Sequence, residues 1–179
     1  MHKIAVIGTG YVGLVGGAGL ADFGNHVVCV DRVEEKIEQL ERGEIPFYEP
    51  RLSEVVQRNV RERRLSFTTD IAAAVAENDV VFCAVGTPEA DGGKVDLTQV
   101  DDVAAEVGRN MTGHRIIVQK STVPVGTARR LRKIIEENQT GPFEFDVVSN
   151  PEFLREGSAV EDFMRPDRVV VGADSERAF

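Results

Sequence analysis

The sequence alternates between two kinds of apolar pattern, and this alternation restricts its fold more than any other feature. Seven short runs are rich in β-branched residues, mostly apolar on both faces and too short for helices. They are residues 3–7, 26–30, 65–68, 80–85, 115–119, 145–149 and 168–171. Between them, apolar residues recur at helical spacing within segments 33–40, 52–60, 100–111 and 128–135. The pattern predicts an α/β fold: a doubly wound parallel sheet in three layers, with right-handed crossover helices on both faces.

Length and charge narrow the class of protein further. The chain has 179 residues, which is enough for about one domain. Its formal net charge of −9 opposes binding to nucleic acid or to an anionic membrane, because both need a basic surface. Residues 4–21 carry no charge, but the six glycines among them argue against a signal peptide or a membrane span.

A glycine-rich turn directly follows the first predicted strand. Gly8, Gly10 and Gly13 form the pattern G-x-G-x-x-G, and Asp31 ends the next strand 18 residues after Gly13. In this pattern the first glycine permits a tight turn, the second lets backbone N–H groups approach a pyrophosphate, and the third lets the helix pack on the sheet. The helix N-terminus adds partial positive charge. We therefore predict a Rossmann-like dinucleotide site in which Asp31 binds the adenosine ribose.

The same residues indicate which dinucleotide is bound. The Asp31 carboxylate would repel a 2′-phosphate, which favours NAD over NADP, although the neighbouring Arg32 weakens that preference. Glycines 16, 17 and 19 lie inside the first predicted helix, where each costs about 1 kcal/mol relative to alanine. We interpret these three as close contacts between helix and sheet, not as ligand contacts.

Both cysteines lie in predicted strands. With the usual order of a doubly wound sheet, Cys29 and Cys83 are on either side of the first strand and about 9.5 Å apart. This exceeds the limit of about 7 Å for a disulfide, so we expect free, buried thiols. Free thiols favour a reducing compartment, and we expect a cytoplasmic protein.

Three more segments leave predicted strands at the edge where ligands bind in open α/β sheets. Gly86-Thr87-Pro88 follows the fourth strand, and Lys120-Ser121-Thr122 follows the fifth, before a helix expected near Thr127. Glu152 and Glu156 follow the sixth strand and, four residues apart, would share one side of a helical turn. Taken alone, such hydroxyls are more often helix caps, and such a glutamate pair is more often a solvated helix face, than catalytic groups.

Longer motifs resemble those of the UDP-glucose/GDP-mannose dehydrogenase family and occur in the same order. They are residues 8–13, 46–50 (P-F-Y-E-P), 67–70 (F-T-T-D), 85–88 (V-G-T-P), 120–127 (K-S-T-V-P-V-G-T) and 149–157 (S-N-P-E-F-L-R-E-G). The last two are long and specific. Residues 162–168 and the valine-rich run after them resemble the UDP-glucose branch more than the GDP-mannose branch.

The resemblance implies an NAD-dependent oxidoreductase of the UDP-glucose 6-dehydrogenase type. Such enzymes oxidise the C6 hydroxymethyl of UDP-glucose to the carboxylate of UDP-glucuronate with two NAD, through an aldehyde and a thioester on a cysteine. The implied catalytic residues are Glu152 and Thr122, which act together through water, and the backbone of Phe153, Leu154 and Arg155 would bind the sugar beside Glu152. The cofactor-binding residues would be Gly8, Gly10, Tyr11, Val12, Gly13, Asp31, Lys36, Gly86, Thr87, Pro88, Ser121, Thr122 and Glu156. No metal site is predicted.

Part of the family's machinery is absent from these residues. The thioester-forming cysteine, the lysine and asparagine that stabilise its oxyanion, the central helix and the nucleotide-sugar-binding domain would all lie beyond position 179. We therefore expect residues 1–179 to be the N-terminal NAD-binding domain, inactive alone, of a parent enzyme that is a homodimer. The alternatives are a non-catalytic dinucleotide-binding module, which would not need Glu152 or Thr122, and a GDP-mannose dehydrogenase. A hydroxyacyl or phosphogluconate dehydrogenase would lack both long motifs.

Overall fold

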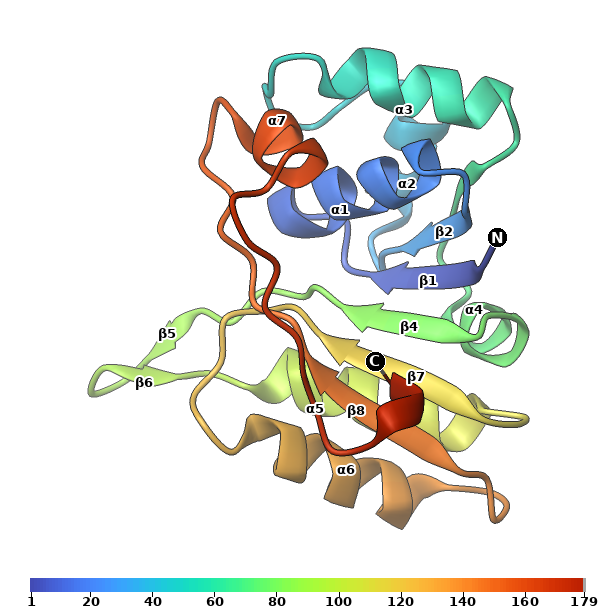
Figure 1. The fold of residues 1–179 in the computed structure, drawn as a ribbon, viewed down its shortest axis with the longest axis vertical. Coiled ribbons are helices and arrows are strands. Elements are labelled where there is room, and N and C mark those ends of the chain that lie inside the picture. The colour runs from blue at the N-terminus through green and yellow to red at the C-terminus, as the bar shows by residue number, and fades with distance from the viewer. Residues whose placement is uncertain (179) are drawn as a thin grey trace.

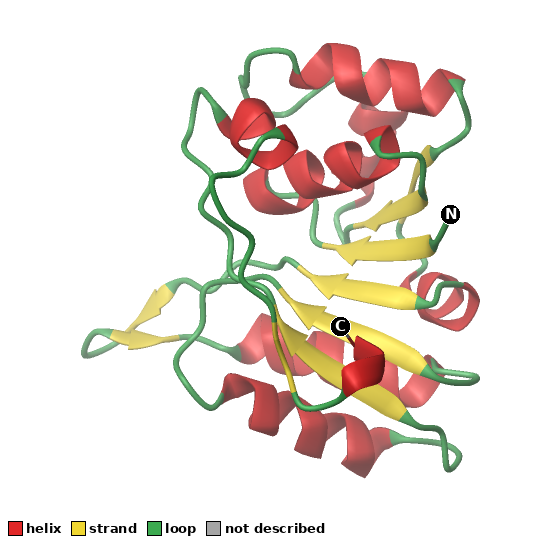
Figure 2. Cartoon of the chain, in the orientation of Figure 1, coloured by secondary structure: helices red, strands yellow, loops and turns green. Residues whose placement is uncertain are grey.

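The computed structural model describes residues 1–178, which form a sheet between two layers of helices (Figures 1 and 2). The main sheet has the order β3-β2-β1-β4-β7-β8-β9. Its strands are β1 (Lys3–Ile7), β2 (His26–Val30), β3 (Leu65–Thr68), β4 (Val80–Cys83), β7 (Arg115–Gln119), β8 (Phe145–Ser149) and β9 (Gly172–Ala173). All neighbours pair in parallel except β8 and β9, which are antiparallel. The predicted doubly wound α/β fold and its strand order are confirmed.

Two apolar clusters hold the helices to opposite faces of the sheet. Strand β1 contributes Ile4 and Val6 to one cluster and Ala5 and Ile7 to the other, as expected of alternating side chains. The first face carries α1 (Tyr11–Asp22), α2 (Glu34–Glu41), α3 (Leu52–Arg61) and α7 (Ala159–Met164). The second face carries α4 (Ile71–Glu77), α5 (Thr98–Asn110) and α6 (Thr127–Asn138). A small hairpin of β5 (Glu89–Ala90) and β6 (Lys94–Val95) precedes α5, and a 3-10 turn spans Glu176–Ala178.

Three predictions about elements need correction. The fourth strand ends at Cys83 instead of residue 85. The strand predicted over residues 168–171 is wrong: the last strand is Gly172–Ala173, and Val169 is 67% exposed. β-branched residues favour a strand where their side chains pack on a half-buried sheet surface, and residues 168–171 do not lie on such a surface. Helix α4 was not predicted; its N-terminus is capped by the Asp70 carboxylate, which accepts from the Ala73 N–H at 2.9 Å.

The glycines inside α1 have two different packing partners. A Cβ on Gly17 would lie 2.5 Å from Cys29 Sγ on β2, so the predicted contact between helix and sheet is confirmed there. A Cβ on Gly19 would instead collide with the Phe163 ring of α7, and Gly16 faces the same ring at 3.7 Å. For these two glycines the prediction was wrong, because α7 is a tertiary neighbour that local sequence does not reveal.

The two cysteines occupy the positions expected of them. Strands β2 and β4 both pair with β1, and Cys29 and Cys83 are buried and free. Burial raises the pKa of each thiol to about 12. Among the described residues, no helix combines the length and apolar character needed to cross a membrane.

Candidate functional site

The glycine turn lies between the end of β1 and the start of α1. Gly8 has a φ of +105°, and a Cβ there would approach the Ala84 carbonyl oxygen to 2.5 Å. A Cβ on Gly13 would collide with the Gly8 carbonyl and lie 3.3 Å from the Ala84 Cβ. At Gly10, by contrast, no atom of the described residues other than its chain neighbours would be within 4 Å. The fold therefore needs glycine at positions 8 and 13, whereas position 10 leaves an open approach to the backbone at the helix N-terminus.

Asp31 lies directly against this turn. Its carboxylate accepts hydrogen bonds from the Thr9 N–H at 3.1 Å, the Thr9 hydroxyl at 2.7 Å and the Val33 N–H at 3.1 Å, and Lys36 Nζ lies 3.5 Å away. Burial opposes ionisation of Asp31, but these hydrogen bonds and Lys36 outweigh it and hold the pKa below its usual value. Asp31 and Lys36, both predicted cofactor residues, are thus neighbours of the turn.

The predicted residues that follow β4 and β7 are also brought together. The Thr87 hydroxyl donates to the Thr122 carbonyl oxygen at 2.8 Å, and the Ser121 hydroxyl donates to the Val85 carbonyl oxygen at 2.7 Å. These bonds join the two segments at the carboxyl edge of adjacent parallel strands. The same edge carries the glycine turn, because β1 pairs in parallel with β4.

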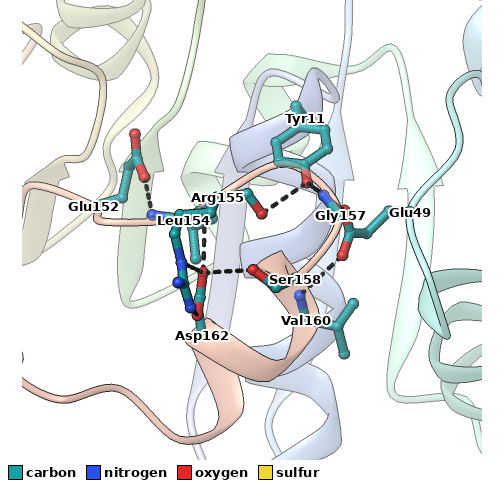
Figure 3. Close-up of polar contacts among 9 residues, drawn as sticks. All are labelled: Tyr11, Glu49, Glu152, Leu154, Arg155, Gly157, Ser158, Val160 and Asp162. Carbon is teal, nitrogen blue, oxygen red and sulfur yellow. Dashed lines mark hydrogen bonds and ion pairs between the residues drawn. The ribbon is translucent and has the colours of Figure 1, made fainter.

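The helical turn predicted for Glu152 and Glu156 is wrong. Residues 150–155 form no helix, and α7 begins only at Ala159. Glu152 Oε2 accepts from the Leu154 N–H at 2.6 Å, closing a local turn that competes with helix formation (Figure 3). Pro151 also biases the residue before it toward extended backbone. The two glutamates therefore do not lie side by side on a helix face.

A cleft of about 1050 Å³ opens beside this segment. It is lined by all four residues predicted to bind the sugar, which are Glu152, Phe153, Leu154 and Arg155, together with Lys120, Asn150 and Arg168. The residues lining the cleft do not include Thr122, Glu156 or the glycine turn. The structure thus gathers the predicted sugar-binding residues in one cleft and most of the predicted cofactor-binding residues along the neighbouring strand ends. Of the others, Lys36 lies in α2 and Glu156 in the turn before α7.

Two buried residues near these segments, Lys120 and Glu49, were not predicted to have a role. Lys120 is buried, and its Nζ donates to Asn150 Oδ1 at 3.1 Å in the cleft wall. Burial lowers the pKa of Lys120, and the charge of Glu152 opposes that change. Glu49 is buried against Tyr11 and the start of α7. The 46–50 and 120–127 motifs already contained both residues, but nothing in either motif indicated burial.

The fold and site together define a dinucleotide-binding domain of the Rossmann type. The chain matches the model of the UDP-glucose/GDP-mannose dehydrogenase family, NAD binding domain, over residues 2–179. Similar proteins include UDP-glucose 6-dehydrogenase TuaD of Bacillus subtilis, 51% identical over 99% of this chain, and UDP-glucose 6-dehydrogenase of Rhizobium meliloti, 54% identical over 96%. The chain belongs to the UDP-glucose/GDP-mannose dehydrogenase family and is its NAD-binding domain.

Solved structures agree with this assignment. A UDP-glucose dehydrogenase from Pyrobaculum islandicum superposes with a TM-score of 0.96 at 44% identity, covering 99% of this chain and 42% of the other. A GDP-mannose dehydrogenase from Pseudomonas aeruginosa gives 0.94 at 35% identity, with 98% and 42% covered. The chain spans 39% of the length of both curated relatives named above.

Proposed function

We propose that this chain is the cofactor-binding part of an enzyme that oxidises the C6 hydroxymethyl of UDP-glucose to a carboxylate with two NAD. The observation that carries the proposal is the open approach at Gly10 beside the partly buried Asp31 carboxylate, in a chain about half identical to UDP-glucose 6-dehydrogenases. The arrangement matches the needs of a dinucleotide, which requires backbone N–H groups for its pyrophosphate and a carboxylate for its ribose.

The residues that would hold NAD meet along one edge of the sheet. The turn from Gly8 to Gly13, including Tyr11 and Val12, would cradle the pyrophosphate. Asp31, already oriented by Thr9, would accept from the ribose, with Lys36 beside it. The segments containing Gly86, Thr87, Pro88, Ser121 and Thr122 would line the path toward the sugar, and Glu156 would lie near the nicotinamide. When bound, NAD supplies the hydride acceptor for both oxidation steps.

Glu152 is the residue we propose to handle the proton at the substrate hydroxyl, together with Thr122 through water. Among residues 1–178 the Leu154 N–H donates to Oε2 of Glu152 and no hydrogen bond reaches Oε1, so Oε1 is the oxygen proposed to accept from the sugar. The N–H groups of Leu154 and Arg155 already donate to Glu152 and Asp162. At Leu154 the backbone group offered to the sugar is therefore the carbonyl, whereas the Arg155 carbonyl already accepts from the Ser158 N–H at 3.0 Å.

The thiol chemistry of the complete reaction would come from another part of the enzyme. Cys29 and Cys83 are buried in strands, and their raised pKa values leave little thiolate at neutral pH. We therefore propose that the chain alone binds NAD but does not turn over UDP-glucose.

A second candidate substrate has a specific observation in its favour. The GDP-mannose dehydrogenase structure superposes almost as well as the UDP-glucose dehydrogenase, with TM-scores of 0.94 and 0.96. Its identity is lower, at 35% against 44%. This difference supports UDP-glucose as the substrate and keeps GDP-mannose as the alternative.

Two statements about the parent enzyme belong to the same proposal. Free, buried thiols suit a reducing compartment, which supports a cytoplasmic enzyme. A homodimeric parent stays a prediction from the family resemblance.

The experiment is a calorimetric titration of the folded chain with NAD, compared with Asp31→Ala and with Asp79→Ala as control. Asp79 is exposed and lies at the opposite edge of the sheet, at the start of β4. A lost charge-assisted hydrogen bond costs about 1.5–3 kcal/mol. Asp31→Ala should therefore raise the Kd by about tenfold or more, since 1.4 kcal/mol is tenfold. Circular dichroism must show that the variant is folded, because Asp31 also holds Thr9. A folded wild-type chain without NAD affinity would contradict the proposal.

A further inference from the structure

A buried carboxylate joins three segments that are far apart in the sequence. Glu49, only 6% exposed, accepts hydrogen bonds from the Tyr11 hydroxyl, from the Gly157 N–H at 2.8 Å and from the Val160 N–H at 3.5 Å (Figure 3). We call these four residues the Glu49 cluster. Tyr11 is the first residue of α1, and Glu49 lies in the loop before α3. Gly157 lies two residues before α7, and Val160 is the second residue of that helix.

The charge of Glu49 is stabilised by hydrogen-bond donors alone. Within residues 1–178, no lysine, arginine or histidine forms an ion pair with it. Burial opposes ionisation of Glu49, but the hydrogen bonds from Tyr11 and the backbone outweigh it and hold the pKa below its usual value. The same environment raises the pKa of Tyr11 to about 12, through burial first and then through its bond to Glu49. Tyr11 therefore remains a hydroxyl donor.

Glu49 also replaces a cap that α7 does not provide for itself. Ser158 precedes α7, but its side chain makes no capping hydrogen bond. Instead the Glu49 carboxylate accepts from the N–H groups of Gly157 and Val160, which lie 108 and 111 positions away in the sequence. Because the first N–H groups of a helix lack partners within it, this bond ties the start of α7 to the loop before α3.

The cluster connects the proposed cofactor turn with the proposed sugar-binding segment. Tyr11 follows Gly10 directly, and its ring packs on Phe47 at 5.1 Å between centroids. Its hydroxyl also lies 3.4 Å from the Arg155 carbonyl oxygen and 3.2 Å from the Gly157 nitrogen. Any displacement of Tyr11 is thus transmitted to residues 155–157, which begin three positions after Glu152.

We propose that Glu49 is a positioning residue that couples dinucleotide binding at the glycine turn to the order of residues 152–160. The inference rests on the proposed function, because it takes the turn to be where NAD binds. NAD that fixes the N-terminus of α1 also fixes Tyr11, and Tyr11 with Glu49 then restrains the start of α7. By linkage, an ordered 152–160 segment strengthens NAD binding by the same factor.

A neutral isostere tests the role of the carboxylate. Both oxygens of a carboxylate accept hydrogen bonds, whereas a glutamine places an NH2 group against one of the donors. Glu49→Gln therefore keeps the shape of the side chain and leaves one donor of the cluster facing another. Glu54→Gln is the matched control, because Glu54 is exposed in the first turn of the neighbouring helix α3.

The experiment is hydrogen–deuterium exchange of this chain with and without saturating NAD, followed in peptides that cover residues 152–160, together with calorimetry. In wild type and Glu54→Gln, NAD should slow exchange in these peptides. In Glu49→Gln the slowing should be lost, and the Kd for NAD should rise by about fivefold or more, within the usual range of coupling between sites. Tyr11→Phe, which keeps the ring against Phe47, should lose most of the slowing as well.

The outcomes separate this inference from the proposed function. If the wild-type chain does not bind NAD, both are overturned. If it binds NAD and Glu49→Gln shows the same NAD-dependent slowing, only the coupling is overturned. If Glu49→Gln raises the exchange rates of these peptides equally with and without NAD, the ratio between the two states is unchanged. That result indicates a merely structural role for Glu49 and overturns the coupling too. If Glu49→Gln does not fold, Tyr11→Phe decides, and unchanged NAD-dependent slowing in that variant overturns the coupling.

Discussion

Alanine substitutions at Gly13 and Gly10 should have different effects: Gly13→Ala should lower stability, and Gly10→Ala should weaken NAD binding. At Gly13, the new Cβ would lie 2.9 Å from the Gly8 carbonyl carbon and even closer to its oxygen, with the Ala84 Cβ at 3.3 Å. The obstacle is backbone held between β1 and β4, so it cannot move aside as a flexible side chain would. At Gly10, no atom of residues 1–178 beyond its chain neighbours would be within 4 Å, and the backbone angles of φ −70° and ψ −173° suit alanine.

The magnitudes follow from this difference. Overpacking a fixed site costs about 1–3 kcal/mol, and we expect Gly13→Ala near the upper value. For a chain of this length that lowers Tm by roughly 6–12 °C, at about 2–4 °C for each kcal/mol. Gly10→Ala should change stability by less than about 1 kcal/mol, because the alanine also restricts the unfolded chain. Its Cβ would occupy the approach to the pyrophosphate, and the Kd for NAD should rise by about tenfold or more.

Two measurements on each variant check the reasoning. Urea denaturation followed by circular dichroism gives the free energy of unfolding, and calorimetric titration gives the Kd for NAD. Gly13→Ala with wild-type stability would refute the close packing of the turn. Gly10→Ala with wild-type NAD affinity would refute the placement of the pyrophosphate, whatever its stability.

Two further predictions concern the thiols and one buried carboxylate. Because burial raises the pKa of Cys29 and Cys83 to about 12, neither should react with a thiol reagent at pH 8 in the folded chain, and both should react in urea; rapid labelling of the native chain would contradict this. Burial of Asp146 is outweighed by hydrogen bonds from Ser175, His114 and Arg177, so its pKa lies below the usual value. A depressed carboxyl pKa contributes stability that is complete above the unfolded pKa, about 4, and is lost as the pH falls through the folded pKa. Unfolding free energies measured from pH 7 to pH 2 should therefore fall less steeply in Asp146→Asn, and an identical slope would contradict this role.

The alternating pattern was sufficient to predict most of the sheet. Buried parallel strands read as continuous apolar runs because both faces are covered, and this property is local to each strand. The predicted bounds of β1, β2, β3, β7 and β8 agree with the structure. The run over residues 168–171 failed for the opposite reason, since its three valines are 40–67% exposed and no helix layer covers them within residues 1–178.

The candidate site also contains features that the sequence predicted and one that it did not. Gly8, Gly13 and Asp31 were recognisable from sequence because a tight turn, a close helix and an acidic strand end each impose one residue type at a fixed spacing. The geometry of Glu152 could not be predicted from sequence. Its spacing from Glu156 suggested a helix, but its carboxylate accepts from the Leu154 N–H two residues later, which forms a local turn instead.

The sequence alone determined the fold class, the dinucleotide turn and the family, since each depends on local residue types and their spacing. Only the tertiary structure decided that Glu49 is buried beneath Tyr11 and the start of α7, that Gly19 makes room for Phe163, and that Lys120 lies in the wall of the cleft. These contacts join residues from about 30 to more than 140 positions apart. Burial and hydrogen-bond partners at such separations are set by how the layers pack, which no local pattern encodes.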